Sequence, residues 1–356
     1  MVCNLGNHLF EYTGNVHIHT RYSDGEKTVP EIARHAALAN LDFIIINDHD
    51  YMAKTLHVEY EGYHGGVLVL MGLELGKRFH HYLAFDLSEM VRGKGLRPQS
   101  VIDHVKEKGG FGFLAHPFEK GMPFRDNSIA YTWNDLSVTG YTGICIWNFS
   151  SRWKERVRTV LHGLFFMLFK TWTLKGPSRK TLLFWDKVCA ARRVVAIGGS
   201  DAHGALFRWG PFRLTPLSYR DGLSSINIHL LLDHPLAKDS IDAGKQLYGA
   251  MKEGRLHIAH ERLASSKGFR FYYACKGGPT LEMGEERAFQ PGTLFVETPH
   301  KGEIRLLKNG ILLVRRTGSS FSFAVETPGV YRVEVYLRAP FFGLRPWIFS
   351  NPIYLR

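Results

Sequence analysis

The sequence has few cysteines, and they are far apart. Only four occur among its 356 residues, and no two form a CxxC pair: Cys3, Cys145, Cys189 and Cys275. Such scattered thiols argue against a disulfide framework and fit a reducing compartment. The first 15 residues also lack a basic segment followed by a long apolar one, so we predict no signal peptide and a cytoplasmic protein.

Long apolar runs are absent as well. The longest, LHGLFFMLF at 161–169, falls short of the roughly 20 apolar residues that a membrane span needs. Basic residues lie on both sides of it: Lys154, Arg156, Arg158, Lys175, Arg179 and Lys180. This charge leaves a peripheral membrane contact through 154–180 open. The short run instead favours a core helix or an insertion over the mouth of an active site.

The overall composition is that of a globular protein with a surplus of positive charge. Apolar residues make up 45% and charged residues 22% of the chain, and the length suggests two domains. No low-complexity tract or repeat of fixed period is visible. The formal net charge of +12 favours anionic partners, such as a phosphorylated small molecule, a nucleotide or nucleic acid.

Strand and helix patterns alternate between residues 14 and 203. Apolar runs predict strands at 15–19, 41–46, 67–73, 111–115, 143–147 and 194–197, and periodic segments predict helices at 29–39 and 100–108. Continuous apolar runs such as 41–46 are typical of buried parallel strands. The alternation therefore predicts an α/β fold with a parallel sheet or barrel.

The pattern changes to β alternation after about residue 265. Six segments share it: RFYYACK, TLFVET, EIRLLK, ILLVRR, SFSFAV and VYRVEVYLR. Asn309-Gly310 between two apolar runs is a strong hairpin motif, and residues 327–329 form a second turn motif. We therefore predict two domains, a barrel over 1–264 and a small antiparallel β-sandwich over 265–356.

Histidines and carboxylates follow the predicted strands of the first domain. They lie in the motifs HIHT, SDG, NDHD, GLELG, HHYLAF, FGFLAHP and GGSDAHG and are His17, His19, Asp24, His49, Glu74, His80, His81, His116, Asp201 and His203. Residues i and i+2 of a strand share a face, and parallel barrels gather their active sites at the carboxyl ends of their strands. The cluster predicts metal binding. Its nitrogen and oxygen ligands suit Zn, Mn or Fe.

The order of these motifs and the residues in them resemble those of the PHP family, named for polymerase and histidinol phosphatase domains. The resemblance covers about residues 14–205. The ending WIFSNPIYLR is similar to a β-module that closes some bacterial members. The resemblance implies a distorted (β/α)7 barrel with two or three divalent ions.

The resemblance also implies a ligand set for each ion. The first ion would be held by His17, His19, Glu74 and Asp201. The second would be held by bridging Glu74, His116 and a histidine before YLAF, which is His81 by the motif, with His80 as the fallback. The third would be held by Asp24, His49 and His203.

Clustered divalent ions suit phosphoester hydrolysis, with a metal-bridging hydroxide as the nucleophile. Glu74, Asp201 and His203 are the expected catalytic residues, since Asp201 could orient the hydroxide or accept its proton. Four cations near the motifs are candidates for binding the phosphate: Arg21, Lys120, Arg125 and Arg208. Taken one at a time, each is better explained as a solvated surface charge. A guanidinium would suit a phosphate best, because it can donate two hydrogen bonds.

Three other functions stay open at this stage. Barrel metallohydrolases that cleave C–N or lactone bonds use similar centres, although the motif order favours a phosphoesterase. A metal-dependent nuclease would suit the net charge, but the sequence shows no aromatic and basic stacking platform. In the third alternative the centre is structural and the β-module binds a partner.

Overall fold

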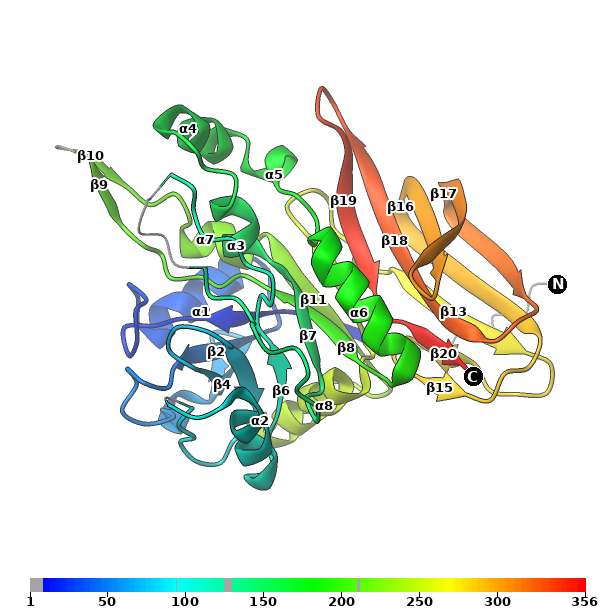
Figure 1. The fold of residues 1–356 in the computed structure, drawn as a ribbon, viewed down its shortest axis with the longest axis horizontal. Helices are drawn as coiled ribbons and strands as arrows, with labels where there is room; N and C mark the ends of the chain where they lie inside the picture. The colour runs from blue at the N-terminus through cyan, green and yellow to red at the C-terminus, as the bar shows by residue number, and fades with distance from the viewer. Residues whose placement is uncertain (1–8, 94, 125–129, 210–211) are drawn as a thin grey trace.

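The structure, a computed structural model, describes residues 9–93, 95–124, 130–209 and 212–356, with the side chains of 207–209 and 212 left out (Figure 1). It has a mixed α/β fold with a large sheet and few helices. Among the described residues, 18 strands join in one sheet, and β9 (Phe207–Trp209) pairs separately with β10 (Phe212–Leu214).

Seven strands in the first 200 residues form the part of the sheet that matters for function. They are β1 (Phe10–Ile18), β2 (Phe43–His49), β4 (Val67–Leu75), β5 (Tyr82–Phe85), β6 (Phe111–Leu114), β7 (Gly143–Asn148) and β8 (Val195–Gly199). Only β5 runs against its neighbours in this group, so the other six share one direction. Their carboxyl ends therefore lie at one edge.

The first and last of these strands also meet. The Ser200 N–H donates to the Val16 carbonyl at 3.2 Å, and the His19 N–H donates to the Ala202 carbonyl at 3.0 Å. A parallel bridge joins Ile18 to Ala202. The segments that carry the first and last histidine motifs thus lie side by side, although almost 200 residues separate them.

Helices connect and cover the strands. They are α1 (Val29–Leu38), α2 (Pro98–Glu107), α3 (Phe149–Lys154), α4 (Val160–Leu168), α5 (Lys170–Thr173), α6 (Arg179–Ala191), α7 (Tyr219–Leu223) and α8 (Ser240–Glu253), with a 3-10 turn η1 (Val58–Tyr60). A capping box begins α1, and in it the Thr28 N–H donates to Glu31 Oε2 at 2.9 Å.

The remaining strands extend the sheet toward the C-terminus. They are β3 (Gly62–His64), β11 (Ile226–Leu232), β12 (Leu256–His260), β13 (Arg270–Cys275), β14 (Leu281–Glu282), β15 (Glu286–Arg287), β16 (Gly292–Lys308), β17 (Ile311–Val325), β18 (Gly329–Ala339), β19 (Gly343–Ser350) and β20 (Ile353–Leu355). The Asn309-Gly310 hairpin is confirmed, because Lys308 pairs with Ile311 across it. The barrel, the sandwich and the division at residue 264 stay predictions.

Two large hydrophobic clusters fill most of the interior among the described residues. The larger one is built mainly from strands β1–β8 and helices α1, α2, α6 and α8, and the second mainly from strands β13–β20. Leu231 of β11 and Ala259 of β12 belong to the second cluster, while their neighbours Leu230 and Ile258 belong to the first. β11 and β12 therefore lie between the two cores.

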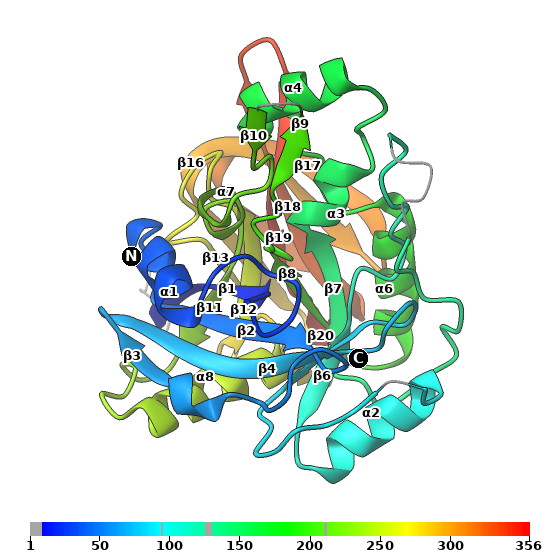
Figure 2. The same ribbon diagram turned by 90° about the vertical axis from the view of Figure 1, so that its left-hand side faces the viewer.

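The apolar run at 161–169 forms α4 and not a core helix, so that alternative is wrong. Among its nine residues only Phe166 is buried, whereas Leu161 and Leu168 are 76% and 77% exposed. Figures 1 and 2 both place α4 at one end of the molecule, near the turn between β18 and β19. Among the described residues, no helix has the length and apolar character needed to cross a membrane.

Candidate metal centre

Glu74 lies at the centre of the histidine cluster, near the carboxyl end of β4. Its Oε1 is 2.8 Å from His81 Nδ1, 3.1 Å from His17 Nε2 and 3.2 Å from His116 Nε2. Its Oε2 is 3.3 Å from both His19 Nε2 and His49 Nδ1. One buried carboxylate therefore faces five imidazole rings.

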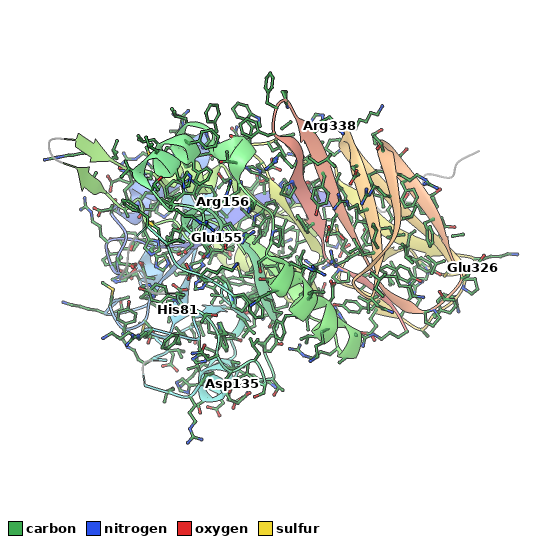
Figure 3. All side chains as sticks on the ribbon, turned by 45° about the horizontal axis from the view of Figure 1, so that its top comes forward. His81, Asp135, Glu155, Arg156, Glu326 and Arg338 are labelled. Atoms are coloured by element: carbon green, nitrogen blue, oxygen red, sulfur yellow. The ribbon has the colours of Figure 1, made fainter. Side chains whose placement is uncertain are left out.

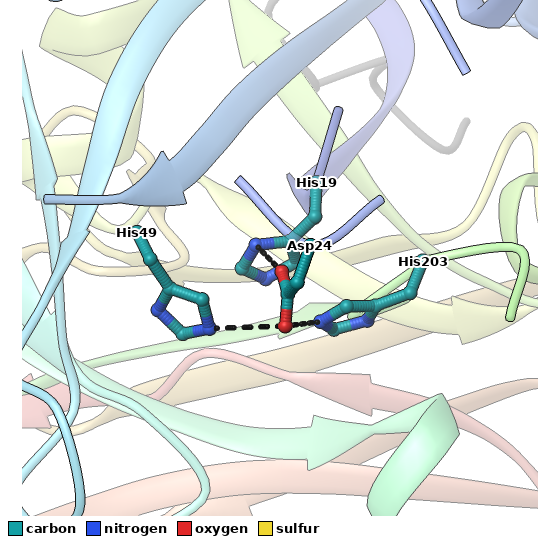
Figure 4. Close-up of side chains that lie close together, drawn as sticks. All are labelled: His19, Asp24, His49 and His203. Carbon is teal, nitrogen blue, oxygen red and sulfur yellow. Dashed lines mark ion pairs between the residues drawn. The ribbon is translucent and has the colours of Figure 1, made fainter. Parts of the chain in front are cut away.

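Asp24 forms a second meeting point on the more open side. Its carboxylate is 3.4 Å from His19 Nδ1, 3.6 Å from His49 Nε2 and 3.2 Å from His203 Nε2 (Figure 4). The Asp24 side chain is 39% exposed, against 2% for Glu74. Solvent and a ligand can thus reach the cluster from the Asp24 side.

Asp201, in the segment after β8, completes the cluster. Its Oδ1 lies 3.4 Å from His17 Nε2 and 3.5 Å from His19 Nε2, and Asn148 at the end of β7 donates an amide hydrogen bond to its Oδ2 at 3.3 Å. The structure therefore brings together all nine predicted ligands.

Backbone strain helps to aim three of these side chains. His17, His116 and Asp201 have φ angles of 64°, 27° and 52°, in the left-handed region that non-glycine residues seldom adopt. At His17 the strain accompanies a register shift between β1 and β2. Strain of this kind persists where the surrounding structure enforces it, and it is concentrated at functional sites.

The cluster fits divalent metal ions. Several buried ring nitrogens have no hydrogen-bond partner among the described residues: both nitrogens of His17, His19 Nε2, His49 Nδ1 and His81 Nε2. Leaving such atoms unpaired is costly unless a ligand satisfies them. Donor atoms that share one ion at about 2.1 Å lie roughly 3 to 3.5 Å apart, which matches most of the distances above.

The ligand atoms fall into overlapping groups whose members lie within 4.8 Å of one another. These groups are His19–Asp24–His49–His203, His17–His116–Asp201, His17–His19–Glu74 and His49–Glu74–His81. These groups contain all nine predicted ligands. They also show that His19 lies beside Asp24, His49 and His203, the residues predicted to hold the third ion. The shared residues show that neighbouring ions would have common ligands.

The imidazoles keep the two central carboxylates ionised. Burial alone would raise the pKa of Glu74, but the charges of His17, His81 and His49 outweigh burial and hold it well below its ordinary value. Burial would also raise the pKa of Asp201, and His17 and Lys154 reverse the effect. Both groups are thus in the anionic form that a metal ion requires.

Adjacent His80 and His81 point in different directions. His81 is buried against Glu74, whereas His80 Nε2 accepts hydrogen bonds from the N–H groups of Asn134 and Asp135, both at 3.2 Å. The structure therefore places His81 in the cluster and His80 outside it. Figure 3 labels His81 among the strands of the first half of the chain.

The predicted phosphate-binding cations are less clearly placed. Arg21 is exposed and its Nε donates to the Glu26 carbonyl at 3.4 Å, and Lys120 is exposed. Arg125 and the side chain of Arg208 lie outside the described part of the chain. No contact of Arg21 or Lys120 ties either residue to the cluster among the described side chains.

Two residues near the cluster were missed by the sequence analysis. Glu119 has a buried side chain with Oε2 3.4 Å from His116 Nδ1, and its i, i+3 spacing from His116 could have indicated it. Lys154, at the end of α3, was counted only as a flank of the apolar run. Burial would lower the pKa of Lys154, but the charges of Asp201 and Glu119 raise it. Lys154 is thus a cation that interacts electrostatically with Asp201 and Glu119.

Comparison with known proteins found a similar sequence and similar solved structures. No family model matches the chain. An uncharacterised protein of Methanocaldococcus jannaschii is 26% identical over 115 residues, which cover 29% of this chain and 67% of that protein.

Two solved structures are also similar to the chain. A two-domain protein of Bacteroides vulgatus that contains a predicted PHP-like metal-dependent phosphoesterase is 14% identical, with a TM-score of 0.47, over 96% of this chain and 95% of that chain. A candidate metal-dependent phosphoesterase of Bifidobacterium adolescentis is 16% identical, with a TM-score of 0.34, over 54% of this chain and 87% of that chain.

Proposed function

We propose that the protein is a metal-dependent phosphoesterase that hydrolyses a phosphomonoester or phosphodiester of a small metabolite or a nucleotide. The position of Glu74 carries the proposal, since its buried carboxylate faces five imidazoles. Four of these rings, those of His17, His19, His49 and His81, have buried nitrogens without a hydrogen-bond partner among the described residues. This donor set suits two or three ions of Zn, Mn or Fe.

Three overlapping ligand sets would hold the ions. His17, His19, Glu74 and Asp201 form the first set, and Glu74 reaches the second through His81 and His116. Asp24, His49 and His203 form the third. The short distances from Glu74 Oε1 to His81 and His116 support a bridging role for this carboxylate.

Bound ions would lower the pKa of a water molecule and neutralise the oxygens of a phosphate group. The chain contributes the remaining functions. Asp201, fixed by the Asn148 amide, is placed to orient the attacking water or to accept its proton. His203 lies on the open side, where it would help to hold the ion that neutralises the phosphate oxygens or the leaving oxygen. Lys154 adds positive charge that attracts the anionic substrate.

We also propose that strands β1 to β8 form the distorted (β/α)7 barrel and that residues 265–356 form an antiparallel β-sandwich on it. The hydrogen bonds between β1 and the segment after β8 support closure of the barrel. The separate hydrophobic cluster of β13–β20 supports a second module.

Metal content and hydrolysis, measured together, test the function. Purified wild-type protein should hold two or three divalent ions per chain and hydrolyse generic phosphomonoesters or phosphodiesters. His17→Ala should lose both properties, while His64→Ala, a change outside the cluster, should keep them. A folded wild type that stays metal-free and inactive after Mn or Zn is added would refute the proposal. Hydrolysis of lactones or amides alone would favour the barrel metallohydrolases.

A further inference from the structure

Helices α4 and α5 and the β18–β19 turn expose a set of large apolar side chains, here called the apolar face. Its members are Leu161, Leu164, Phe165, Leu168, Trp172 and Phe341, which are 76%, 37%, 44%, 77%, 39% and 107% exposed. Leu161, Phe165 and Leu168 are spaced at i, i+4 and i+7, which places them on one side of α4. The apolar side of this helix therefore faces outward.

Folding does not account for this surface. α4 is attached to the protein by Phe166, which packs with Trp153 and Val157 in a small cluster of its own. The other large side chains of α4 contribute little to a core. Contiguous apolar surfaces of this kind in folded proteins mark sites of interaction with a partner or a membrane.

Phe341 is independent evidence that this surface is a site of interaction. It has a φ of 61°, a backbone conformation that favours glycine or asparagine, and its ring is fully exposed. The next residue, Phe342, stacks on Trp172 with ring centroids 5.9 Å apart. Two elements distant in sequence are thus joined in one surface, and Figures 1 and 2 show them at the same end of the molecule.

The chain segment that forms most of the apolar face is basic. Between Glu155 and Asp186 the chain has six basic and no acidic residues. One of the six, Lys170, is paired with Asp221. Arg158, Lys175 and Arg338 are exposed. Figure 3 labels Arg338 near the turn between β18 and β19. The partner of this face should therefore be apolar at its centre and negatively charged around it.

We propose that the apolar face docks on the surface of a lipid bilayer that contains anionic lipids, with α4 lying in the interface and Phe341 entering the boundary of the acyl chains. Apolar side chains beside basic ones are the pattern of interfacial anchors, and each nearby Lys or Arg adds attraction to anionic head groups. A second copy of the chain is a poorer partner, because a symmetric contact would bring two basic rims together.

The apolar face is also connected to the candidate metal centre. Helix α3 directly precedes it, and its Ser151 hydroxyl donates to Glu119 at 3.2 Å. The Phe124 N–H donates to the Val157 carbonyl at 2.9 Å, between α3 and α4. Docking would hold this side of the protein near the head groups. The docking inference does not depend on the reaction that the centre catalyses.

Vesicle co-sedimentation of the full-length protein tests the inference. The vesicles are phosphatidylcholine alone, or phosphatidylcholine with one third phosphatidylserine. One variant removes the apolar contacts, with Leu161→Ser, Leu168→Ser and Phe341→Ser. A second reverses charge, with Arg158→Glu, Lys175→Glu and Arg338→Glu. The matched control removes exposed apolar side chains on β17, with Ile311→Ser, Leu312→Ser and Leu313→Ser. Circular dichroism and metal content establish that each variant is folded.

We expect binding to the anionic vesicles that weakens with salt, at least a tenfold loss of apparent affinity in both test variants, and unchanged affinity in the control. Absence of binding to either vesicle would overturn the inference. Equal losses in the control and the test variants would overturn it as well. Light scattering that shows a dimer in the wild type and a monomer in the apolar variant would assign the face to a second copy instead.

Discussion

At the scale of single residues, His80 and His81 offer a matched comparison. Both residues directly precede β5, but only the ring of His81 faces Glu74. We expect His81→Asn to lower metal content and to reduce hydrolysis roughly 100-fold or more, since a ligand is lost. His80→Asn should keep both, because asparagine tolerates the φ of 60° at this position.

Metal analysis and kinetics on the two variants decide between the rings. His80→Asn should still lose about 1 kcal/mol of stability, because His80 Nε2 accepts two backbone hydrogen bonds. Equal loss of metal in both variants would contradict the assignment of His81, and loss in His80→Asn alone would reverse it.

His229 is a buried histidine with a different task. Its Nδ1 lies 2.9 Å from Glu11 and its Nε2 3.1 Å from Glu261. Burial alone would lower the pKa of His229, but hydrogen bonds to these carboxylates raise it to about 9. With His257 and Glu11 it also has the spacing of a metal site, yet both its nitrogens already have partners. We interpret it as a structural imidazolium.

The raised pKa of His229 predicts a pH dependence of stability. A pKa above the ordinary 6.5 means that the charged form is stabilised on folding, so the contribution is complete below about pH 6.5. It is lost as pH rises toward about 9 and amounts to on the order of 3 kcal/mol. The stability advantage of wild type over His229→Gln should therefore shrink between pH 6.5 and 9.

Urea unfolding of both proteins across this pH range measures the effect. The difference between them removes contributions from other groups that titrate above pH 8. A constant difference from pH 6 to 10 would show that His229 is neutral in the folded protein.

At the scale of elements, α8 provides a test of local stability away from the candidate centre. The Asp239 carboxylate caps its N-terminus and accepts hydrogen bonds from the N–H groups of Ile241 at 3.0 Å and Asp242 at 3.1 Å. Asp239→Ala should lower the free energy of unfolding by about 1 kcal/mol. Metal content and hydrolysis should not change.

Asp242→Ala is the control for this cap. Asp242 also lies in the first turn, but its side chain only pairs with exposed Lys245. Its removal should cost less than half as much in chemical unfolding. Equal losses would show that the general charge of the helix end, and not the cap, stabilises α8.

Helices and strands with strong local patterns could be predicted from the sequence. The predicted helix at 29–39 is α1, and the apolar run at 67–73 is β4. TLFVET and EIRLLK were predicted as two strands, yet they form the single strand β16. The pairing register shifts between Glu297 and Gly302, and a bulge lets the chain stay extended where the alternating pattern breaks.

Other features depend on tertiary contacts that no local pattern contains. The motifs indicated all nine candidate ligands, because each lies at or shortly after the end of an apolar run. The effect of Lys154 on Asp201 depends on the packing of α3 against β7. Likewise, the run at 161–169 is apolar on nearly every side, so its composition could not show which side faces outward.

At the scale of the whole molecule, the C-terminal strands are bonded into the rest of the protein. Arg332 of β18 forms a bidentate ion pair with Asp186 of α6, in which its Nε donates to Oδ1 at 2.7 Å and its Nη2 donates to Oδ2 at 2.9 Å. β12 pairs with β19. Deletion of residues 265–356 would expose these buried groups, so loss of activity in such a fragment would report unfolding and not a catalytic role for the module.

Asn351 is the better probe of this connection. It is buried, and its side chain satisfies backbone groups of two strands that belong to the other part of the chain. Its Oδ1 accepts from the Ala196 N–H at 2.7 Å, and its Nδ2 donates to the carbonyls of Ala196 at 2.9 Å and Leu256 at 3.1 Å. The Asn351 side-chain amide thus forms hydrogen bonds with backbone groups of β8 and β12 that a neighbouring strand would otherwise form.

Asn351→Leu should therefore destabilise the whole molecule. The leucine has a similar volume but leaves the buried N–H and carbonyl of Ala196 without these hydrogen bonds, each at a cost of about 1 to 3 kcal/mol. The Leu256 carbonyl keeps the hydrogen bond from the backbone N–H of residue 351. We expect the midpoint of thermal unfolding to fall clearly, as one transition that both circular dichroism and loss of bound metal follow. Thr317→Leu on exposed β17 should leave it unchanged. If metal is retained through the first transition of the Asn351 variant, the C-terminal strands unfold separately, and the module is energetically independent of the candidate metal centre.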